Sequence, residues 1–194
     1  MNENINIQAV PSFCLNHIQL DVLRLDELHP IVSGNKWFKL KYYLLQAQKQ
    51  NADTIASFGG PYSNHLVALA YAAKEYNLKS IGYVRSNIDE PITPTLQEAM
   101  QYGMDLKFVG RNNFQEFKKE LIENNQVNHT YFIDEGGYGI LGAQGAATIL
   151  SNEKTNSYNH IICAVGTGTM MAGLIDAAKP HQHVIGIPVL KNEA

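Results

Sequence analysis

The sequence predicts an α/β fold with parallel sheets flanked by helices. Strand-like runs rich in Ile, Val, Phe or Tyr alternate with segments that carry apolar residues at three- and four-residue spacing. Strands that alternate with helices form parallel sheets with helices on both faces. No internal repeat indicates a solenoid, and no low-complexity segment interrupts the alternation.

The predicted strands are short, and the predicted helices lie between them. The strands span residues 54–58, 80–84, 105–109, 130–133, 160–165 and 183–189. The helices span residues 36–50, 64–76, 95–102, 114–124, 141–150 and 170–178. Gly103 follows the third helix and is predicted to end it, because glycine readily takes the left-handed conformation found there.

Composition and charge indicate a globular protein that acts on small molecules. The chain has 194 residues, is 45% hydrophobic and carries a net charge of -3, with no basic tract that would suit nucleic acid or an anionic membrane. The N-terminus lacks a signal-peptide pattern, and the longest apolar run, residues 66–73, is too short to span a bilayer. We therefore expect a cytoplasmic protein with no membrane or nucleic-acid partner.

The cysteines and histidines do not indicate a disulfide framework or a metal site. Cys14 and Cys163 lack metal-ligand spacing, and two cysteines are too few for a disulfide scaffold, so we expect reduced thiols. The histidines outside the motifs below share no helical face, and we predict no metal site.

The first chemically suggestive segment is the helix start around two lysines. Lys36 and Lys39 are three residues apart, so both amines leave one face of a helix that Ser33 or Asn35 is predicted to cap. One amine could form a Schiff base while the other holds a phosphate. The alternative is that both are solvated surface charges, as most lysines near a helix start are.

A second segment joins a strand to a helix through Gly59 and Gly60. Ser63, Asn64 and His65 start that helix, so backbone N–H groups and polar side chains converge at its N-terminus, where anions bind. A histidine at a helix start is more often a cap or a solvent-facing group than a catalyst, and that alternative applies to His65.

The third segment, Gly166-Thr167-Gly168-Thr169, follows the apolar strand at 160–165. Its glycines let the backbone approach a phosphate, its threonines offer hydroxyls, and the next helix adds its dipole. A structural tight turn and a dinucleotide loop are the alternatives. A dinucleotide loop expects an acidic residue about 20 positions further on. None occurs after the next strand before Glu193, which disfavours a nicotinamide cofactor.

Together the three segments, residues 34–40 (GNKWFKL), 59–65 (GGPYSNH) and 166–169 (GTGT), resemble the 1-aminocyclopropane-1-carboxylate deaminase and D-cysteine desulfhydrase family. These are fold-type II pyridoxal phosphate enzymes, similar to the tryptophan synthase β subunit. The resemblance extends from about Asp21 onward. It implies a smaller α/β domain at 53–133 inserted into a larger cofactor domain formed by 1–52 and 134–194.

The resemblance also assigns roles to single residues. It implies that Lys36 carries pyridoxal 5'-phosphate as a Schiff base and acts as general base and acid, with Ser63 as the second catalytic residue. It places Asn64 at the 3-oxygen of the cofactor. It assigns the substrate carboxylate to Ser63, Asn64 and His65, and the cofactor phosphate to Lys39, Gly166, Thr167, Gly168 and Thr169. Residues 135–139 resemble a segment that lines the active site, although a flexible loop explains them equally well.

The function implied is deamination or elimination on a small amino acid, releasing ammonia and a 2-oxo acid. His65 matches the desulfhydrase-like motif more closely than the deaminase-like one, in which an amide is usual. The alternatives are a catalytically impaired fragment that binds the cofactor and a nicotinamide-dependent oxidoreductase built on the Gly166 loop. Family members continue beyond the strand at 183–189, so the resemblance implies an incomplete larger domain and a weakly active, homo-oligomeric chain.

Overall fold

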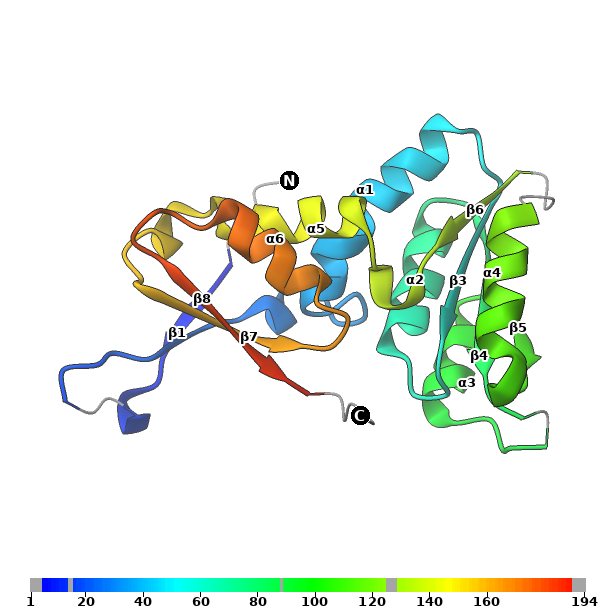
Figure 1. Ribbon diagram of the computed structural model, residues 1–194, viewed down its shortest axis with the longest axis horizontal. Coiled ribbons are helices and arrows are strands. Elements are labelled where there is room, and N and C mark those ends of the chain that lie inside the picture. Colours follow the sequence, from blue (N-terminus) through cyan, green and yellow to red (C-terminus); the bar gives the residue numbers. More distant parts are fainter. Residues whose placement is uncertain (1–4, 14–15, 88, 125–128, 190–194) are drawn as a thin grey trace.

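The computed structural model describes residues 5–13, 16–87, 89–124 and 129–189. Cys14 and Glu193 lie outside these ranges. The chain folds into two side-by-side regions, with a four-stranded sheet on one side and a two-stranded parallel sheet on the other, and helix α1 between them (Figure 1). Helix α1, Asn35–Lys49, buries one face in each region, with Leu40 and Leu44 in one core and Phe38 in the other.

The four-stranded sheet is entirely parallel and has the strand order β5-β4-β3-β6. Its strands are β3 (Thr54–Gly59), β4 (Lys79–Arg85), β5 (Met104–Val109) and β6 (Thr130–Ile133). The chain winds outward from β3 through β4 to β5 and then returns to the other side of β3. Ligands of such sheets bind where this direction reverses, at the carboxyl ends of the strands, which here are the ends of β3 and β6.

Three helices cover this sheet. Helices α2 (Asn64–Glu75) and α3 (Pro94–Gln101) pack in one core with Ile55 and Val84. Helix α4 (Phe114–Asn124) packs through Phe114 in a second core with Phe58 and Tyr83. Every residue of β3 is buried, as expected for a central strand covered on both faces.

The second region is a stack of helices on a two-stranded sheet. Strands β7 (His160–Val165) and β8 (His183–Pro188) pair in parallel, and α6 (Thr169–Ala177) packs on them. Helix α5 (Ile140–Ala147) lies between α6 and α1. Glycines allow this close stacking: a Cβ at Gly145 would lie 2.1 Å from the Phe38 carbonyl oxygen of α1. At Gly173 of α6 it would lie 2.2 Å from the Ala143 carbonyl oxygen of α5.

All six predicted strands and all six predicted helices are present, with small shifts at their ends. The largest shift is in α5, which stops at Ala147 and continues as a 3₁₀ turn, Thr148–Ser151, instead of reaching residue 150. The Thr148 hydroxyl donates to the Gly145 carbonyl oxygen at 2.7 Å, a local bond that competes with helix continuation. Gly103 ends α3 at φ 91°, as predicted.

Two features of the fold were not predicted correctly. Strands β1 (Ile7–Ala9) and β2 (Asp21–Leu23) form a short antiparallel pair that was missed, because three-residue strands leave no readable alternation. The predicted cap of α1 by Ser33 or Asn35 is wrong. Gly34 occupies the cap position at φ 63°, and the Asn35 side chain is engaged elsewhere.

Besides Thr148–Ser151, the short 3₁₀ turns are Pro11–Phe13, Leu25–Glu27, Arg111–Asn113, Glu135–Gly137 and Glu153–Thr155.

No described residue range packs over one face of the β7–β8 sheet. Ile162, Ile185 and Ile187 point away from α6 and are each at least 40% exposed. In the part of the chain that the structure describes, no helix has the length and hydropathy needed to cross a membrane. The four strands of the larger sheet come from residues 54–133, yet the division into domains at 53–133 stays a prediction.

Candidate functional site

The two lysines at the start of α1 are largely withdrawn from solvent. Lys39 is 4% exposed and Lys36 is partly buried. Burial lowers the pKa of Lys36, and burial together with the positive charge of Lys36 lowers the pKa of Lys39 to about 8. The Lys36 amine donates a hydrogen bond to Asn35 Oδ1 at 2.8 Å. Lys39 is therefore buried and Lys36 partly buried on the same helix face, so the surface-charge alternative is wrong.

Lys39 reaches across to the loop that precedes α6. Its Nζ donates to Thr167 Oγ1 at 3.5 Å, and that hydroxyl lies 3.0 Å from Thr169 Oγ1. Gly168 caps α6 in the left-handed conformation, φ 78°, and contributes no side-chain cap. An amine, two hydroxyls and the free N–H groups of a helix start thus meet in one place, as an anion site requires.

The start of α2 has a different construction. Ser63 caps the helix, and its Oγ accepts a hydrogen bond from the Leu66 N–H at 3.4 Å. Gly59 makes room for this cap, since a Cβ there would lie 2.6 Å from Ser63 Oγ. Asn64, the first helical residue, is exposed, and its predicted contact with the cofactor stays a prediction.

His65 points into the protein interior. It is 2% exposed, its Nε2 lies 2.9 Å from Ser57 Oγ, and its buried Nδ1 has no hydrogen-bond partner among the described residues. Burial, followed by the positive charges of Lys36 and Lys39, lowers its pKa to about 3. The alternative that His65 caps the helix or faces solvent is therefore wrong.

The turn after β6 joins these parts. A Cβ on Gly136 would lie 2.9 Å from Thr167 Cγ2. A Cβ on Gly137, which has φ 71°, would lie 3.5 Å from Lys39 Cβ and 3.6 Å from His65 Cε1. The turn therefore passes between the lysine face of α1, the threonine loop and the start of α2.

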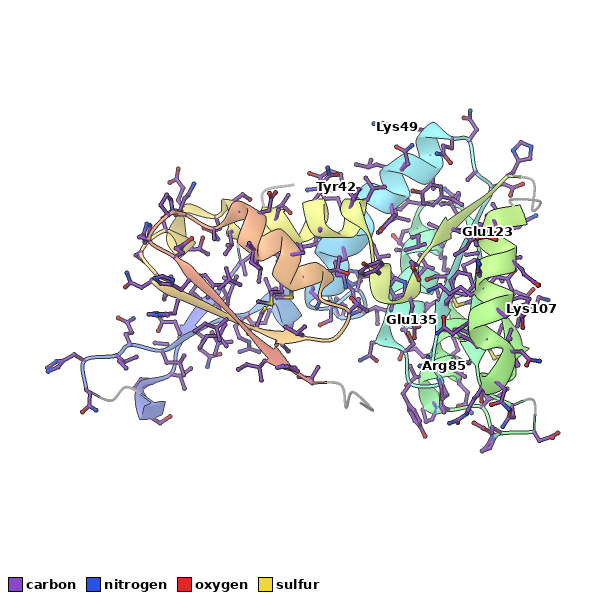
Figure 2. The ribbon with its side chains drawn as sticks, viewed as in Figure 1. Tyr42, Lys49, Arg85, Lys107, Glu123 and Glu135 are labelled. Carbon is purple, nitrogen blue, oxygen red and sulfur yellow. The ribbon has the colours of Figure 1, made fainter. Side chains whose placement is uncertain are left out.

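Ion pairs anchor the same turn to the four-stranded sheet. Asp134 pairs with Lys118 of α4, and Glu135 pairs with Arg85 at the end of β4 at 3.7 Å. Arg85 and Glu135 lie together at the carboxyl edge of the sheet (Figure 2). The site therefore lies at the carboxyl ends of β3 and β6, where the winding of the sheet reverses.

Sequence reasoning missed two residues of this site. Asn35 was assigned to capping, yet it accepts from Lys36 and donates to Met170 Sδ at 3.3 Å. Ser57 was counted within an apolar strand, yet its hydroxyl contacts His65. The only signal for Ser57 was a hydroxyl inside an otherwise apolar central strand.

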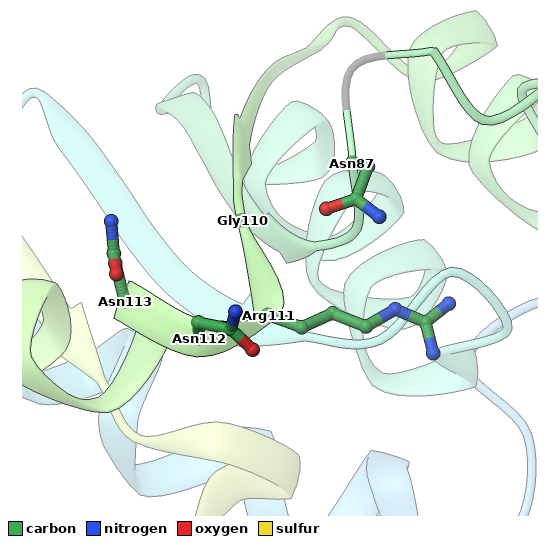
Figure 3. A pocket seen from close by; sticks show the side chains of 5 residues that line it. All are labelled: Asn87, Gly110, Arg111, Asn112 and Asn113. Atoms are coloured by element: carbon green, nitrogen blue, oxygen red, sulfur yellow. The ribbon is translucent and has the colours of Figure 1, made fainter.

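A separate hollow of about 300 Å³ lies beside the end of β5 (Figure 3). Its lining is made by Asn87, Gly110, Arg111, Asn112 and Asn113. The Arg111 guanidinium is already paired with Glu90 at 3.0 Å, and the lining offers no amine nucleophile. The two-lysine site has the amines that this hollow lacks, so we assign the function there.

The comparisons with known proteins agree with this chemistry. The family described as pyridoxal-phosphate dependent enzyme matches residues 15–193. A Thermotoga maritima relative, named provisionally as a 1-aminocyclopropane-1-carboxylate deaminase, is 31% identical over 180 residues, which are 86% of this chain and 57% of the relative. The mitochondrial bifunctional D-cysteine desulfhydrase/1-aminocyclopropane-1-carboxylate deaminase of Arabidopsis thaliana is 27% identical over 87% of this chain and 46% of its own.

Solved structures show the same fold. The crystal structure of a 1-aminocyclopropane-1-carboxylate deaminase homologue superimposes with a TM-score of 0.78 at 24% identity, covering 95% of this chain and 60% of that one. A fungal L-serine ammonia-lyase from Rhizomucor miehei gives a TM-score of 0.70 at 19% identity. The fold is thus the fold-type II α/β architecture, and the chain spans about half the length of the curated relatives it matches.

Proposed function

From the premise that the chain belongs to the pyridoxal-phosphate dependent enzyme family, we propose that it serves as a deaminase or lyase acting on a small amino acid. The observation that carries this proposal is the pair of lysines on one face of α1, with Lys39 buried and directed at the threonine loop and Lys36 partly buried and held by Asn35 Oδ1. The expected products are ammonia and a 2-oxo acid. Family membership fits this proposal better than a nicotinamide-dependent oxidoreductase built on the same loop.

The residues present fit the cofactor. Pyridoxal phosphate carries a dianionic phosphate, which suits the Lys39 amine, the hydroxyls of Thr167 and Thr169, and the helix start at Gly166–Gly168. It also carries an aldehyde, which suits the Lys36 amine, because burial keeps more of that amine unprotonated than in a solvated lysine. Gly136 keeps the turn clear of the threonine loop, where a side chain would collide with Thr167.

When bound, the cofactor supplies an electron-withdrawing ring conjugated to the amino group of the substrate. The part assigned to the chain is to place groups around that ring and to move a proton. Lys36 Nζ, held by Asn35 Oδ1, is the group proposed to take and return a proton at the substrate carbon. Its lowered pKa suits this role, since an ammonium cannot act as a base.

The start of α2 is proposed to bind the substrate carboxylate. Its first N–H groups have no partner inside the helix, and its dipole favours a negative charge. The Ser63 hydroxyl lies at the cap of the same helix and is proposed to take part in carboxylate binding and catalysis, with Asn64 as its neighbour on the solvent side. A carboxylate carries less charge than a phosphate, and this site has no lysine of its own.

The substrate class is inferred from the relatives. Their names point to D-cysteine and to 1-aminocyclopropane-1-carboxylate. Reaction with D-cysteine would proceed by removal of the α-proton and loss of the β-substituent, whereas the cyclopropane substrate would require ring opening. We propose D-cysteine first, because the chain has a histidine at position 65, as in the desulfhydrase-like motif.

The test is to locate the covalent attachment. The chain is mixed with pyridoxal 5'-phosphate, reduced with borohydride, digested and mapped by mass spectrometry. We expect a pyridoxyl adduct on Lys36, and none after Lys36→Ala. The matched control is Lys41→Ala, because Lys41 is an exposed lysine on the same helix. An adduct on Lys39 or Lys41 with Lys36 unmodified would contradict the proposal.

A further inference from the structure

His65 is a buried polar side chain of this region for which the proposed function names no contact. It projects inward from the second residue of α2, is 2% exposed, and leaves Nδ1 without a partner among the described residues. An unpaired polar atom in the interior costs free energy comparable to a lost hydrogen bond, so its position calls for a physical role.

The contacts around Ser57 favour one position for the imidazole proton. A serine hydroxyl has one hydrogen to donate. Ser57 Oγ donates to the backbone carbonyl oxygen of Asp134 at 3.5 Å. Both contacts can be made at once if the imidazole donates its Nε2–H to Ser57 Oγ across the 2.9 Å contact. With the proton on Nε2, Nδ1 keeps a lone pair that can only accept.

The charged groups around the ring keep it neutral. Lys36 and Lys39 project from α1, and their charges add to burial in lowering the pKa of His65 to about 3. On the turn after β6, Asp134 is paired with Lys118 and Glu135 with Arg85, so neither carboxylate is free to stabilise an imidazolium. His65 therefore does not act as a cation or as a general acid near neutral pH. With its one N–H given to Ser57, the side chain also cannot donate to the substrate carboxylate that the resemblance assigned to it.

We propose that His65 is a positioning residue whose ring is held by Ser57 with the proton on Nε2, so that Nδ1 accepts a hydrogen bond from an amine or hydroxyl donor of the ligand bound beside Lys36 and Lys39. Gly137 separates His65 from Lys39, with its hypothetical Cβ 3.6 Å from both His65 Cε1 and Lys39 Cε. The ring thus lies next to the two-lysine site, with Gly137 between it and Lys39. The statement about the ligand rests on the proposed function, whereas the statement about the proton does not.

The first experiment is nitrogen NMR on the whole chain with labelled histidine, and it needs no cofactor. The resonances of His65 are assigned by their loss in His65→Gln. We expect the Nε2–H tautomer and no titration between about pH 5 and about pH 8, the window in which ordinary histidines titrate. A proton on Nδ1, or titration inside this window, would overturn the inference.

Ser57→Ala tests the anchor. Without the hydroxyl, we expect the His65 signals to show both tautomers or to broaden through exchange between them. Ser80→Ala is the matched control. Ser80 is a buried serine on the neighbouring strand, so this substitution also removes a buried hydroxyl, but one away from the ring. An unchanged single tautomer in folded Ser57→Ala would show that Ser57 does not fix the proton.

The last experiment tests the ligand contact with pyridoxal 5'-phosphate as the probe. Saturation with the probe is expected to shift the Nδ1 resonance of the natural chain. His65→Gln, which keeps an amide near Nε2 only, should weaken probe binding about five-fold, the scale of one hydrogen bond. His65→Asn, with an amide near Nδ1, should restore most of it. An unmoved Nδ1 resonance with equal affinity in His65→Gln would overturn the ligand contact, and a reducible adduct on Lys36 in the same sample would show that the proposed function survives.

Discussion

The starts of α2 and α6 have the same backbone arrangement but differ in charge: α2 has a neutral ring beside it, and α6 has a cationic amine. Each helix follows a parallel strand through a glycine-containing loop. Helix α2 is capped by Ser63 and backed by the neutral ring of His65. Helix α6 begins at Gly168 without a side-chain cap and faces the amine of Lys39.

If the proposed function is right, this difference directs two anions, a phosphate and a carboxylate, to separate helix starts. Both helix starts offer N–H groups and a dipole, which are worth about 0.3–1 kcal/mol each toward a negative charge. Only the start of α6 adds a cation, and hydrogen bonds to charged groups are roughly twice as strong as neutral ones. We therefore expect a phosphate to prefer the start of α6 and a carboxylate to be left for the start of α2.

The largest expected effect comes from removing the cation. Lys39→Gln should weaken binding of pyridoxal 5'-phosphate by about 2–3 kcal/mol, because a buried charge-assisted contact is lost. The affinity is measured by titration followed by absorbance. Lys41→Gln removes an exposed lysine of the same helix and should leave the affinity unchanged. Equal losses in the two variants would mean that overall charge, rather than the position of Lys39, governs binding.

The same cation predicts a pH dependence. The pKa of Lys39 is lowered to about 8, so its positive charge is present below that pH and is lost as the pH rises through it. Affinity for inorganic phosphate should fall several-fold across this range, and it should be nearly flat in Lys39→Gln. Because the charge of Lys36 contributes to the lowering, Lys36→Met should move the fall to higher pH. A fall that persists in Lys39→Gln would assign it to another group.

The hydroxyls of the α6 loop should matter next. Thr167→Val together with Thr169→Val is expected to weaken cofactor affinity by about 1–3 kcal/mol, the scale of two hydrogen bonds to a charged group. Since Thr169 is 3% exposed, the folded state is checked by circular dichroism. The control is Thr93→Val at the cap of α3, which removes a capping hydroxyl elsewhere. An unchanged dissociation constant in the double variant would remove this loop from the phosphate site.

Local periodicity was enough to predict the main elements, and pairwise side-chain contacts were not. The buried strand β3 and the largely apolar helix α2 can be recognised from composition and length. The sequence could also place Lys36 and Lys39 on one face, because three-residue spacing fixes that geometry. It could not show that Asn35 donates to Met170 of α6, or that Ser57 contacts His65, since both contacts depend on how separate elements pack.

The smallest expected effect lies at the start of α2, and it separates the two helix starts most cleanly. Ser63→Ala removes a cap, which should lower the free energy of unfolding by about 1 kcal/mol. Cofactor affinity should stay nearly unchanged, because the phosphate is assigned to α6. Binding of D-cysteine to the cofactor-loaded chain should weaken several-fold, as measured by the spectral change on adding the amino acid. Ser63→Thr keeps a capping hydroxyl and is the matched control. If Ser63→Ala weakens the cofactor as much as the amino acid, the two helix starts share one anion and the contrast between them is wrong.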